Sequence, residues 1–260
     1  MTLVYLDNNA TTMVAPEVVD AMLPYFSNKY GNPSSIYDMA HSANDAVKKS
    51  REIIAGFLGA ADSKEIIFTS CGSESANMAI KGALDVKKNK KHIITTRVEH
   101  PCVLNLYKDL EKRGYRVTWV DVDSNGDLDI SRLLEAVCED TALVSVMMAN
   151  NETGVIYPVV KISEAVKMKN PETKVFVDAV QAAGKIPINV KDTKIDMLGI
   201  SGHKFHAPKG VGALYIRTGT MISPLIVGGH QERGKRAGTE NVPYIAAMAR
   251  AAQLAKEALE

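Results

Sequence analysis

The sequence predicts an α/β fold with a seven-stranded, mainly parallel sheet sandwiched by helices. Short apolar runs rich in β-branched residues alternate with amphipathic stretches along almost the whole chain, and such strand–helix–strand repetition favours parallel strands. Several of these runs lack polar alternation, which is typical of strands buried on both faces.

Each expected strand is a short run of Ile, Val, Leu, Thr or aromatic residues. In chain order the expected strands are 66–69, 92–96, 117–120, 143–148, 175–178, 197–200 and 212–216. The amphipathic stretches predict helices over 17–26, 43–58, 74–87, 103–113, 130–138, 160–168 and 242–260. Ser73 and Ser131 suit helix starts. Because ligands bind at the carboxyl ends of parallel strands, the loops that follow the strands are where we expect chemistry.

Composition excludes several classes of protein. With 46% hydrophobic and 23% charged residues, the 260-residue chain is neither disordered nor of low complexity. Its net charge of +1 creates no general attraction to nucleic acid or anionic lipid, so we expect no nucleic-acid partner. No apolar run reaches about 18 residues, so we expect no membrane partner. Few, scattered cysteines and the lack of a leader pattern predict a reduced, cytoplasmic protein.

Two charged side chains lie at predicted strand ends. Lys204 follows the strand 197–200, and a lysine there can form a Schiff base with a carbonyl if its amine is kept neutral. A surface lysine on a turn fits this short pattern equally well. Asp178 ends the strand 175–178, where a carboxylate can pair with a protonated pyridine nitrogen. Taken alone, it fits a helix cap better.

Three further loops carry polar or small residues after strands. His100 is placed to stack on an aromatic ring or to move a proton, although a structural histidine is the simpler interpretation. Residues 70–75 lead into a helix with small side chains, which suits a phosphate but also a plain turn. Residues 150–154 offer a side-chain amide for a ring hydroxyl. Together with Lys204 and Asp178, these loops point to pyridoxal 5'-phosphate (PLP) and to no metal.

Eight motifs occur in one order across the chain. They are Tyr5–Thr12, Gly31–Ser35, Phe68–Ser75, Glu99–His100, Asn150–Gly154, Asp178–Gln181, Ser201–Lys204 and Arg236–Thr239. In this set the chain resembles the cysteine desulfurases, a branch of the class V aminotransferases among the fold type I PLP enzymes. The resemblance implies removal of sulfur from L-cysteine, which yields L-alanine and an enzyme persulfide that supplies iron–sulfur clusters or thio-cofactors.

The resemblance also assigns roles around the cofactor ring. It implies that Lys204 is the Schiff-base lysine, that Asp178 pairs with the pyridine nitrogen and that Gln181 donates a hydrogen bond to the phenolic oxygen. His100 stacks on the ring and takes part in proton transfer. Asn151 is preferred for the substrate-side contact because it directly precedes the glutamate of its motif.

Phosphate binding and partners follow from the same resemblance. The residues implied to hold the phosphate are Gly72, Ser73, Ser201 and His203. Thr239 reaches the phosphate of the neighbouring subunit, which implies a homodimer, and the sulfur passes to an acceptor or scaffold protein. The chain departs from the family at Tyr37, where a histidine is usual, and at Ala40, where glycine is common.

The resemblance divides the chain into three segments. Residues 1–15 form an N-terminal segment expected to pack with the small domain of longer relatives. Residues 16–245 form the PLP-binding large domain. Residues 246–260 begin a helix that leads to a C-terminal domain absent from this sequence. In the family that domain carries the loop cysteine that attacks sulfur, and an arginine for the substrate carboxylate.

None of the three cysteines replaces that loop cysteine in this interpretation. Cys71 lies in the phosphate turn, Cys138 is expected on a helix far from the strand ends, and Cys102 is expected to be the one thiol next to the cofactor. We therefore expect the chain alone to lack desulfuration at family-like rates. We also expect the Met248 and Leu254 side of the last helix to expose apolar surface.

Other functions remain compatible with the sequence. One is a PLP-dependent relative that acts as a selenocysteine lyase or an aminotransferase. Another is a non-catalytic PLP-binding protein or scaffold. The third is one half of a split enzyme.

Overall fold

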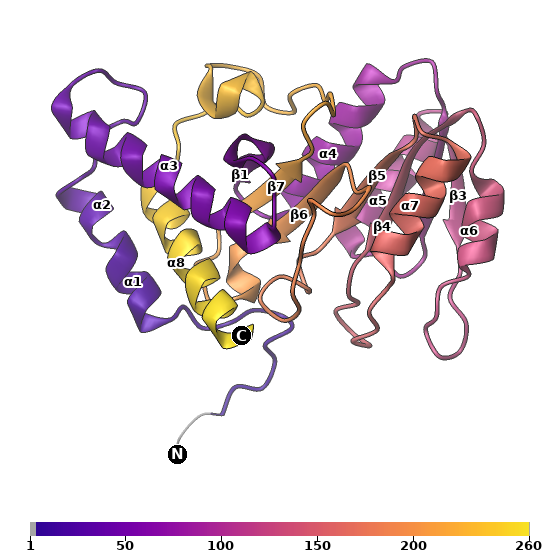
Figure 1. The fold of residues 1–260 in the computed structure, drawn as a ribbon, viewed down its shortest axis with the longest axis horizontal. Coiled ribbons are helices and arrows are strands. Elements are labelled where there is room, and N and C mark those ends of the chain that lie inside the picture. Colours follow the sequence, from indigo (N-terminus) through magenta and orange to yellow (C-terminus); the bar gives the residue numbers. More distant parts are fainter. Residues whose placement is uncertain (1–3, 260) are drawn as a thin grey trace.

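A seven-stranded sheet separates two layers of helices (Figure 1). The computed structural model describes residues 4–259, so residues 1–3 of the expected N-terminal segment and Glu260 of the last helix lie outside it. The strands are β1 (Ile66–Thr69), β2 (His92–Thr96), β3 (Arg116–Val120), β4 (Thr141–Met147), β5 (Lys174–Asp178), β6 (Met197–Ser201) and β7 (Gly212–Ile216). The predicted fold class is confirmed.

Six of the seven strands point in the same direction. The sheet order is β1-β7-β6-β5-β4-β2-β3, and β7 alone runs antiparallel to both of its neighbours. The remaining pairings are parallel. The carboxyl ends of β1, β2, β4, β5 and β6 therefore meet at one edge of the sheet, and the loops that follow these strands share a common space.

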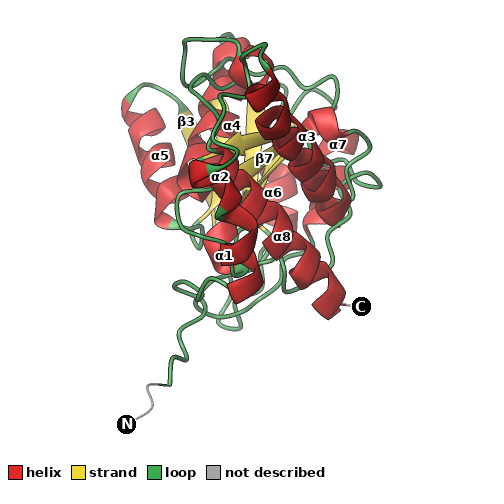
Figure 2. Cartoon of the chain, turned by 90° about the vertical axis from the view of Figure 1, so that its left-hand side faces the viewer, coloured by secondary structure: helices red, strands yellow, loops and turns green. Residues whose placement is uncertain are grey.

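The helices cover both faces of the sheet (Figure 2). They are α1 (Pro16–Met22), α2 (Pro24–Ser27), α3 (Asp38–Leu58), α4 (Gly72–Val86), α5 (Pro101–Lys112), α6 (Ile130–Ala136), α7 (Val159–Lys169) and α8 (Val242–Leu259). Short 3-10 turns form η1 (Ser63–Glu65), η2 (Gly202–Lys204) and η3 (Gln231–Gly234). Among residues 4–259, no helix combines the length and the apolar character needed to cross a bilayer.

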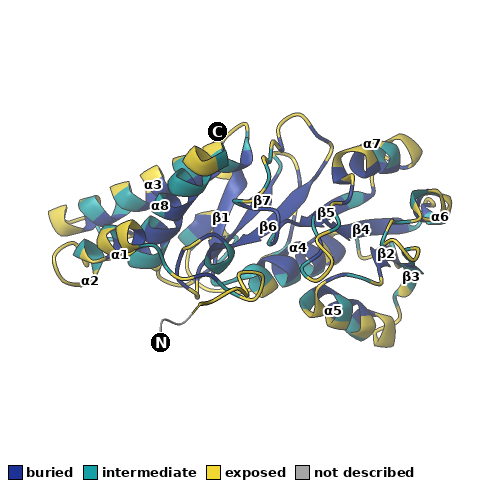
Figure 3. Cartoon of the chain, turned by 90° about the horizontal axis from the view of Figure 1, so that it is seen from below, coloured by how far each residue is buried: buried dark blue, intermediate teal, exposed yellow. Residues whose placement is uncertain are grey.

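Two hydrophobic cores lie on opposite faces of the sheet. One packs the sheet against α4 and α5, and the other packs it against α1, α3, α6, α7 and α8. Side chains alternate between the cores along each strand: Ile66 and Phe68 of β1 enter one core, and Ile67 enters the other. Both faces are thus buried, as Figure 3 shows, which explains the absence of polar alternation in the strands.

Several predicted helix bounds are wrong. The expected helix 17–26 is interrupted at Leu23, because Pro24 cannot donate the backbone hydrogen bond that would continue α1. The long helix α3 begins at Asp38, five residues before the predicted start. Ser73 is the second residue of α4 and not its cap, since the cap position is held by Cys71.

The predicted helix over 130–138 begins at Ile130 as expected but ends two residues early. Its cap is Asp129, whose Oδ1 accepts a hydrogen bond from the backbone N–H of Arg132 at 2.9 Å, so Ser131 does not start it. The helix ends at Ala136, and Cys138 lies beyond it. The sulfur of Cys138 lies 3.6 Å from Nδ1 of His92 at the amino end of β2. The prediction that Cys138 lies on a helix is therefore wrong.

The last helix buries the side that we expected to be exposed. Met248 is fully buried and Leu254 is partly buried, because α8 packs against both α1 and α3. Alanine residues along α8 let these helices approach closely. The apolar surface predicted at Met248 is thus part of the core.

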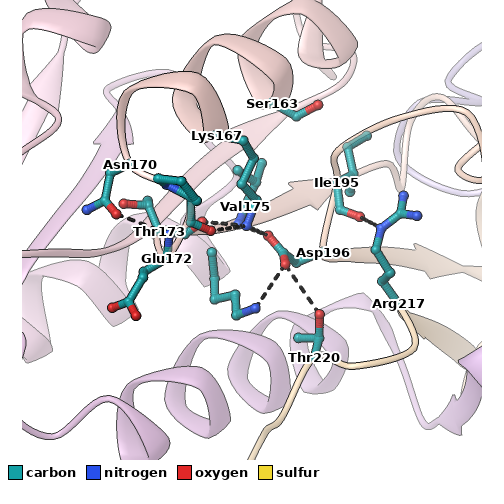
Figure 4. Close-up of polar contacts among 12 residues, drawn as sticks. Ser163, Lys167, Asn170, Glu172, Thr173, Val175, Ile195, Asp196, Arg217 and Thr220 are labelled. Carbon is teal, nitrogen blue, oxygen red and sulfur yellow. Dashed lines mark hydrogen bonds and ion pairs between the residues drawn. The ribbon is translucent and has the colours of Figure 1, made fainter.

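A buried polar network closes the sheet edge opposite the carboxyl ends (Figure 4). Asp196, just before β6, is 4% exposed. Its carboxylate binds the ammonium groups of Lys167 at 2.7 Å and Lys174 at 3.2 Å, and it accepts the backbone N–H of Val175 at 2.8 Å. The Thr220 hydroxyl donates to it at 3.3 Å. The polar groups at the amino ends of β5 and β6 therefore satisfy one another.

Candidate active site

A cavity of about 230 Å³ lies at the carboxyl ends of β1, β2, β4, β5 and β6. Each of these strands is followed by a loop that contributes to its wall. The cavity brings together nine of the ten site residues predicted from the sequence: Gly72, Ser73, His100, Asn151, Asp178, Gln181, Ser201, His203 and Lys204. Among the described residues, no group of three or more His, Cys, Asp or Glu side chains could hold a metal ion.

Asp178 is the buried carboxylate of the cavity. It ends β5 and is 7% exposed. Its Oδ1 accepts the backbone N–H of Val180 at 2.9 Å. Burial raises the pKa of Asp178, whereas that hydrogen bond and the charges of His100 and Lys204 act in the opposite direction. A buried carboxylate that faces a cavity favours a cationic or N–H-bearing ligand group next to it.

The amino end of α4 supplies an anion site. Gly72 and Ser73 are the first two residues of this 15-residue helix, and no side chain caps it. Its first N–H groups therefore face the cavity with the positive end of the helix dipole. The absence of a side chain at Gly72 lets Val180 pack closely against this helix end, because a Cβ at position 72 would lie 2.8 Å from Cγ2 of Val180. This is the geometry that a phosphate requires.

Lys204 ends the turn η2, which directly follows β6. Its ammonium group donates hydrogen bonds to the backbone carbonyls of Asn9 and Ala10, the latter at 2.9 Å. Burial lowers the pKa of Lys204, and the carboxylates of Asp7 and Asp178 oppose that shift. A lowered pKa increases the share of neutral amine, which is the form that attacks a carbonyl.

His100 caps the helix α5. Its Nδ1 accepts the backbone N–H of Cys102 at 3.2 Å. In the neutral ring the proton therefore sits on Nε2, which leaves that N–H available to a ligand in the cavity. The side chain is exposed, unlike that of Asp178, and so it has room to cover a flat ring.

Gln181 lines the cavity and is tied to the N-terminal segment. Its Nε2 donates to the carbonyl of Asn9 at 2.8 Å, and its Oε1 accepts from Lys185 at 2.6 Å. A side-chain amide has two N–H groups, so one remains for a ring oxygen. The predicted role of Gln181 stays a prediction.

The two neighbouring asparagines have different tasks. Asn150 shapes its own loop: its Oδ1 accepts the backbone N–H groups of Glu152 and Thr153, and its Nδ2 donates to the carbonyl of Val98. Asn151 makes none of these contacts and lines the cavity. This arrangement supports the choice of Asn151 over Asn150 for a substrate contact.

Thr239 is the predicted site residue that lies outside this cavity. It lines a separate hollow of about 160 Å³ together with Glu232 and Arg236. The loop that carries it is anchored by two ion pairs. Arg236 pairs with Glu74 of α4 at 2.8 Å, and Arg51 of α3 pairs with Glu232 at 2.6 Å. Its predicted reach into a neighbouring subunit stays a prediction.

Two thiols line the cavity, not one. Cys71 is part of the wall alongside Cys102, so the expectation that Cys102 alone neighbours the cofactor is wrong. Cys71 occupies the cap position of α4, which places it at the anion site. Burial, together with the nearby Asp178 charge, raises the pKa of the Cys102 thiol to about 12. At neutral pH this thiol is protonated and is a poor nucleophile.

The N-terminal segment contributes more to the site than its sequence suggested. Ala10 lines the cavity, and the carbonyls of Asn9 and Ala10 hold Lys204 and Gln181. Thr11 and Thr12 also bind the turn at His203. These contacts join residues more than 170 positions apart, so no local pattern reveals them. The one available signal was the run of small polar residues at 7–12.

The Aminotransferase class-V family model matches residues 4–260. The chain belongs to the class V aminotransferase family. A cysteine desulfurase of Nostoc sp. is 54% identical over 255 residues, which cover 98% of this chain and 63% of that relative. The solved structure of a NifS-like protein is 49% identical with a TM-score of 0.97, over 99% of this chain and 71% of that one. A structure of SspA in complex with cysteine is 40% identical with a TM-score of 0.91, over 96% and 72%.

Class V aminotransferases of this kind are PLP-dependent, and the cavity fits that cofactor. It offers a carboxylate for the ring nitrogen in Asp178, an uncapped helix end for the phosphate at Gly72 and Ser73, and an amine of lowered pKa in Lys204. The predicted family resemblance is thus confirmed. The chain spans about 63% of the length of the curated relative from Nostoc.

Proposed function

We propose that this chain is the PLP-binding part of a cysteine desulfurase, which converts L-cysteine to L-alanine and transfers the sulfur to a cysteine thiol as a persulfide. The observation that carries the proposal is the joint placement of Asp178, Lys204 and the uncapped α4 end around one cavity. The 54% identity to a cysteine desulfurase of Nostoc and the likeness to SspA in complex with cysteine support the choice of substrate.

The chain's own residues hold the cofactor at three points. The Asp178 carboxylate keeps a proton on the ring nitrogen, and Lys204 Nζ provides covalent attachment. The phosphate is held by the first N–H groups of α4 and by Ser73, Ser201 and His203. When bound, PLP supplies an electron sink that stabilises negative charge developing on the substrate.

Two groups are placed to move protons at the substrate. His100 lines the cavity, and because its Nδ1 accepts the backbone N–H of Cys102, the neutral ring carries its proton on Nε2. Lys204 provides an amine that accepts or donates a proton once it is released from the carbonyls of Asn9 and Ala10. Asn151 and Gln181 orient the substrate and the ring from the adjacent loops.

The sulfur-accepting thiol is supplied, in this proposal, by another part of the whole protein. Cys102 remains protonated at neutral pH because burial raises its pKa to about 12. Cys71 occupies the cap position of α4, at the helix end that would hold the phosphate. Neither thiol is on a loop able to travel to the substrate sulfur.

The whole protein acts in this proposal as a cytoplasmic homodimer that passes sulfur to an acceptor or scaffold protein, for iron–sulfur clusters or thio-cofactors. The position of Thr239 supports the dimer. It is exposed and lies outside the cavity formed by its own chain, so it is free to contact a second copy.

A PLP titration of the purified chain tests the cofactor site. We expect a visible absorbance band, and borohydride reduction should attach the cofactor to the peptide that contains Lys204, as detected by mass spectrometry. Lys204→Ala should abolish the attachment. Lys185→Ala is the matched control, because this lysine lies nearby without lining the cavity. Attachment that persists in Lys204→Ala would refute the assignment.

Addition of amino acids to the loaded chain tests the substrate class. We expect L-cysteine to change the absorbance spectrum, and we expect slow or no sulfide release from this chain with a reductant present. Spectral changes with alanine or selenocysteine but none with cysteine would replace the proposal with an aminotransferase or a selenocysteine lyase. Robust sulfide release that disappears in Cys102→Ser would make Cys102 the acceptor thiol.

A further inference from the structure

Glu99 is a buried acidic residue that the proposed chemistry does not use. It lies in the loop between β2 and α5, directly before His100, and it is 4% exposed. A carboxyl group in a loop is usually in water. Burial of this one carries a cost that the surrounding structure has to offset.

One oxygen of Glu99 joins two elements of the site. Its Oε1 accepts the backbone N–H of Met147 at 2.7 Å and the hydroxyl of Thr96 at 2.9 Å. Met147 is the last residue of β4, pairs in register with Asp178 and lines the cavity. Glu99 therefore fastens the loop that carries His100 to the strand next to Asp178.

The other oxygen has no partner. Within residues 4–259, Oε2 of Glu99 is buried and makes no hydrogen bond. An ionised carboxylate would leave a full charge there without a donor, which is far more costly than leaving a neutral hydroxyl. The contacts of Glu99 thus suit a protonated acid.

Within the part of the chain that the structure describes, no basic side chain interacts measurably with a charge on Glu99. The titratable groups that do are Asp178 of β5, Cys102 and Tyr107 of α5, and Tyr157. Burial, followed by the Asp178 charge, raises the pKa of Glu99 to about 8, although the hydrogen bonds from Met147 and Thr96 oppose the shift.

Asp178 is in the opposite situation. The charges of His100 and Lys204 both favour its ionised form. When two buried carboxyl groups lie near each other, they do not both ionise readily, and the one without cationic neighbours keeps the proton.

We propose that Glu99 is a positioning residue of this site: it holds the His100 loop against the end of β4 as a neutral carboxylic acid, so that the negative charge at this side of the cavity belongs to Asp178. The inference rests on the proposed function, because it assigns Glu99 a task only if His100 and Asp178 contact the cofactor.

The protonation state is tested on the PLP-free chain by chemical denaturation between pH 5 and pH 9. The folded state holds a proton that the unfolded state loses near the ordinary glutamate pKa, so this group makes stability fall as pH rises, up to about pH 8. Glu99→Gln removes that proton exchange. We expect the stability difference between the original chain and Glu99→Gln to change steadily with pH up to about 8 and then to level off. A stability difference between the two proteins that stays constant from pH 5 to pH 9 would refute the proposal that Glu99 is a neutral acid in the folded chain.

The positioning role is tested by PLP titration of the variants. Glutamine keeps the acceptor oxygen, so Glu99→Gln should bind PLP within about twofold of the original chain, with the same induced circular dichroism per bound PLP. Glu99→Ala leaves the Met147 N–H without an acceptor, and we expect PLP binding to weaken by about tenfold or more and the dichroism to fall. Glu111→Ala, an exposed change on the helix α5 that follows this loop, is the control.

Hydrogen exchange supplies a readout that does not require PLP. Residues 97–102 should exchange faster in Glu99→Ala than in the original chain and at the original rate in Glu99→Gln. Equal exchange and equal dichroism in all three proteins would overturn the positioning role. Absence of PLP binding in every protein, the original included, would refute the proposed function and leave the stability and exchange results to judge the role of Glu99 in the loop.

Discussion

Loss of the Glu232 charge should strongly destabilise this protein. Glu232 and Arg51 form a two-pronged ion pair with N···O distances of 2.6 and 2.8 Å, and their side chains are only 2% and 11% exposed. Glu232 also accepts the backbone N–H of Phe68 at 3.0 Å. Removal of one partner from a buried pair typically costs 3–5 kcal/mol, because the other charge stays buried without compensation.

We expect Glu232→Gln to lower the free energy of unfolding by about 3 kcal/mol, near the lower end of that range, because glutamine keeps the acceptor for Phe68. The measurement is equilibrium unfolding in urea, where such a loss shifts the midpoint by about 1 M or more. Asp109→Asn, in the exposed pair with Arg113, is the control and should change stability by about 0.5 kcal/mol or less.

A double variant separates charge from shape. Arg51→Met in the Glu232→Gln background removes the uncompensated cation, so it should recover part of the lost stability. The reasoning is refuted if Glu232→Gln costs less than about 1 kcal/mol, or if the double variant is no more stable than Glu232→Gln alone.

Three further outcomes are expected. Asp178→Asn should reduce PLP-dependent spectral changes with amino acids by orders of magnitude while the unfolding midpoint moves little, because a neutral amide does not hold a proton on the ring nitrogen; equal spectral changes would refute the role. Iodoacetamide at pH 8 should modify Cys138 first and Cys102 last, as followed by mass spectrometry. Burial raises the pKa of the Cys138 thiol, but hydrogen bonds from Thr141 and Arg116 outweigh it and lower that pKa, whereas burial raises the pKa of the Cys102 thiol. Gly72→Ala should weaken PLP binding by about tenfold in a titration, because the added Cβ would lie 2.8 Å from Cγ2 of Val180 and would force the cavity wall to shift. Gly56→Ala is the control and should leave binding unchanged, because a Cβ there meets nothing within 4 Å.

The sheet was predictable because each strand carries its own signal. A run such as Ile66–Thr69 is apolar on both faces, and this property depends on four adjacent residues only. The site loops were predictable for a related reason, since parallel strands bring their carboxyl ends together and thereby gather Asp178, His100 and Lys204. Strand order and the reversal of β7 do not follow from these local patterns.

Features that depend on distant packing were missed. Met248 was expected at the surface because the resemblance implied that a second domain would cover it, and only the placement of α1 and α3 shows that these helices cover it instead. The burial of Glu99 likewise depends on Met147, 48 residues further along the chain. The break at Leu23 is different, because Pro24 was a sequence signal for it. The apolar periodicity continues across this proline, and for that reason a single helix was predicted.

The backbone carbonyls of Asn9 and Ala10 accept hydrogen bonds from the amine of Lys204, so they compete with PLP for this amine. An amine that donates to these carbonyls is not free to attack a carbonyl carbon. Attachment of PLP therefore requires that these hydrogen bonds first break. The measured affinity for PLP then equals the intrinsic affinity reduced by the fraction of molecules in which the amine is released. The hydrogen bonds from Lys204 to the carbonyls of Asn9 and Ala10 thereby lower the apparent affinity of the site for its cofactor.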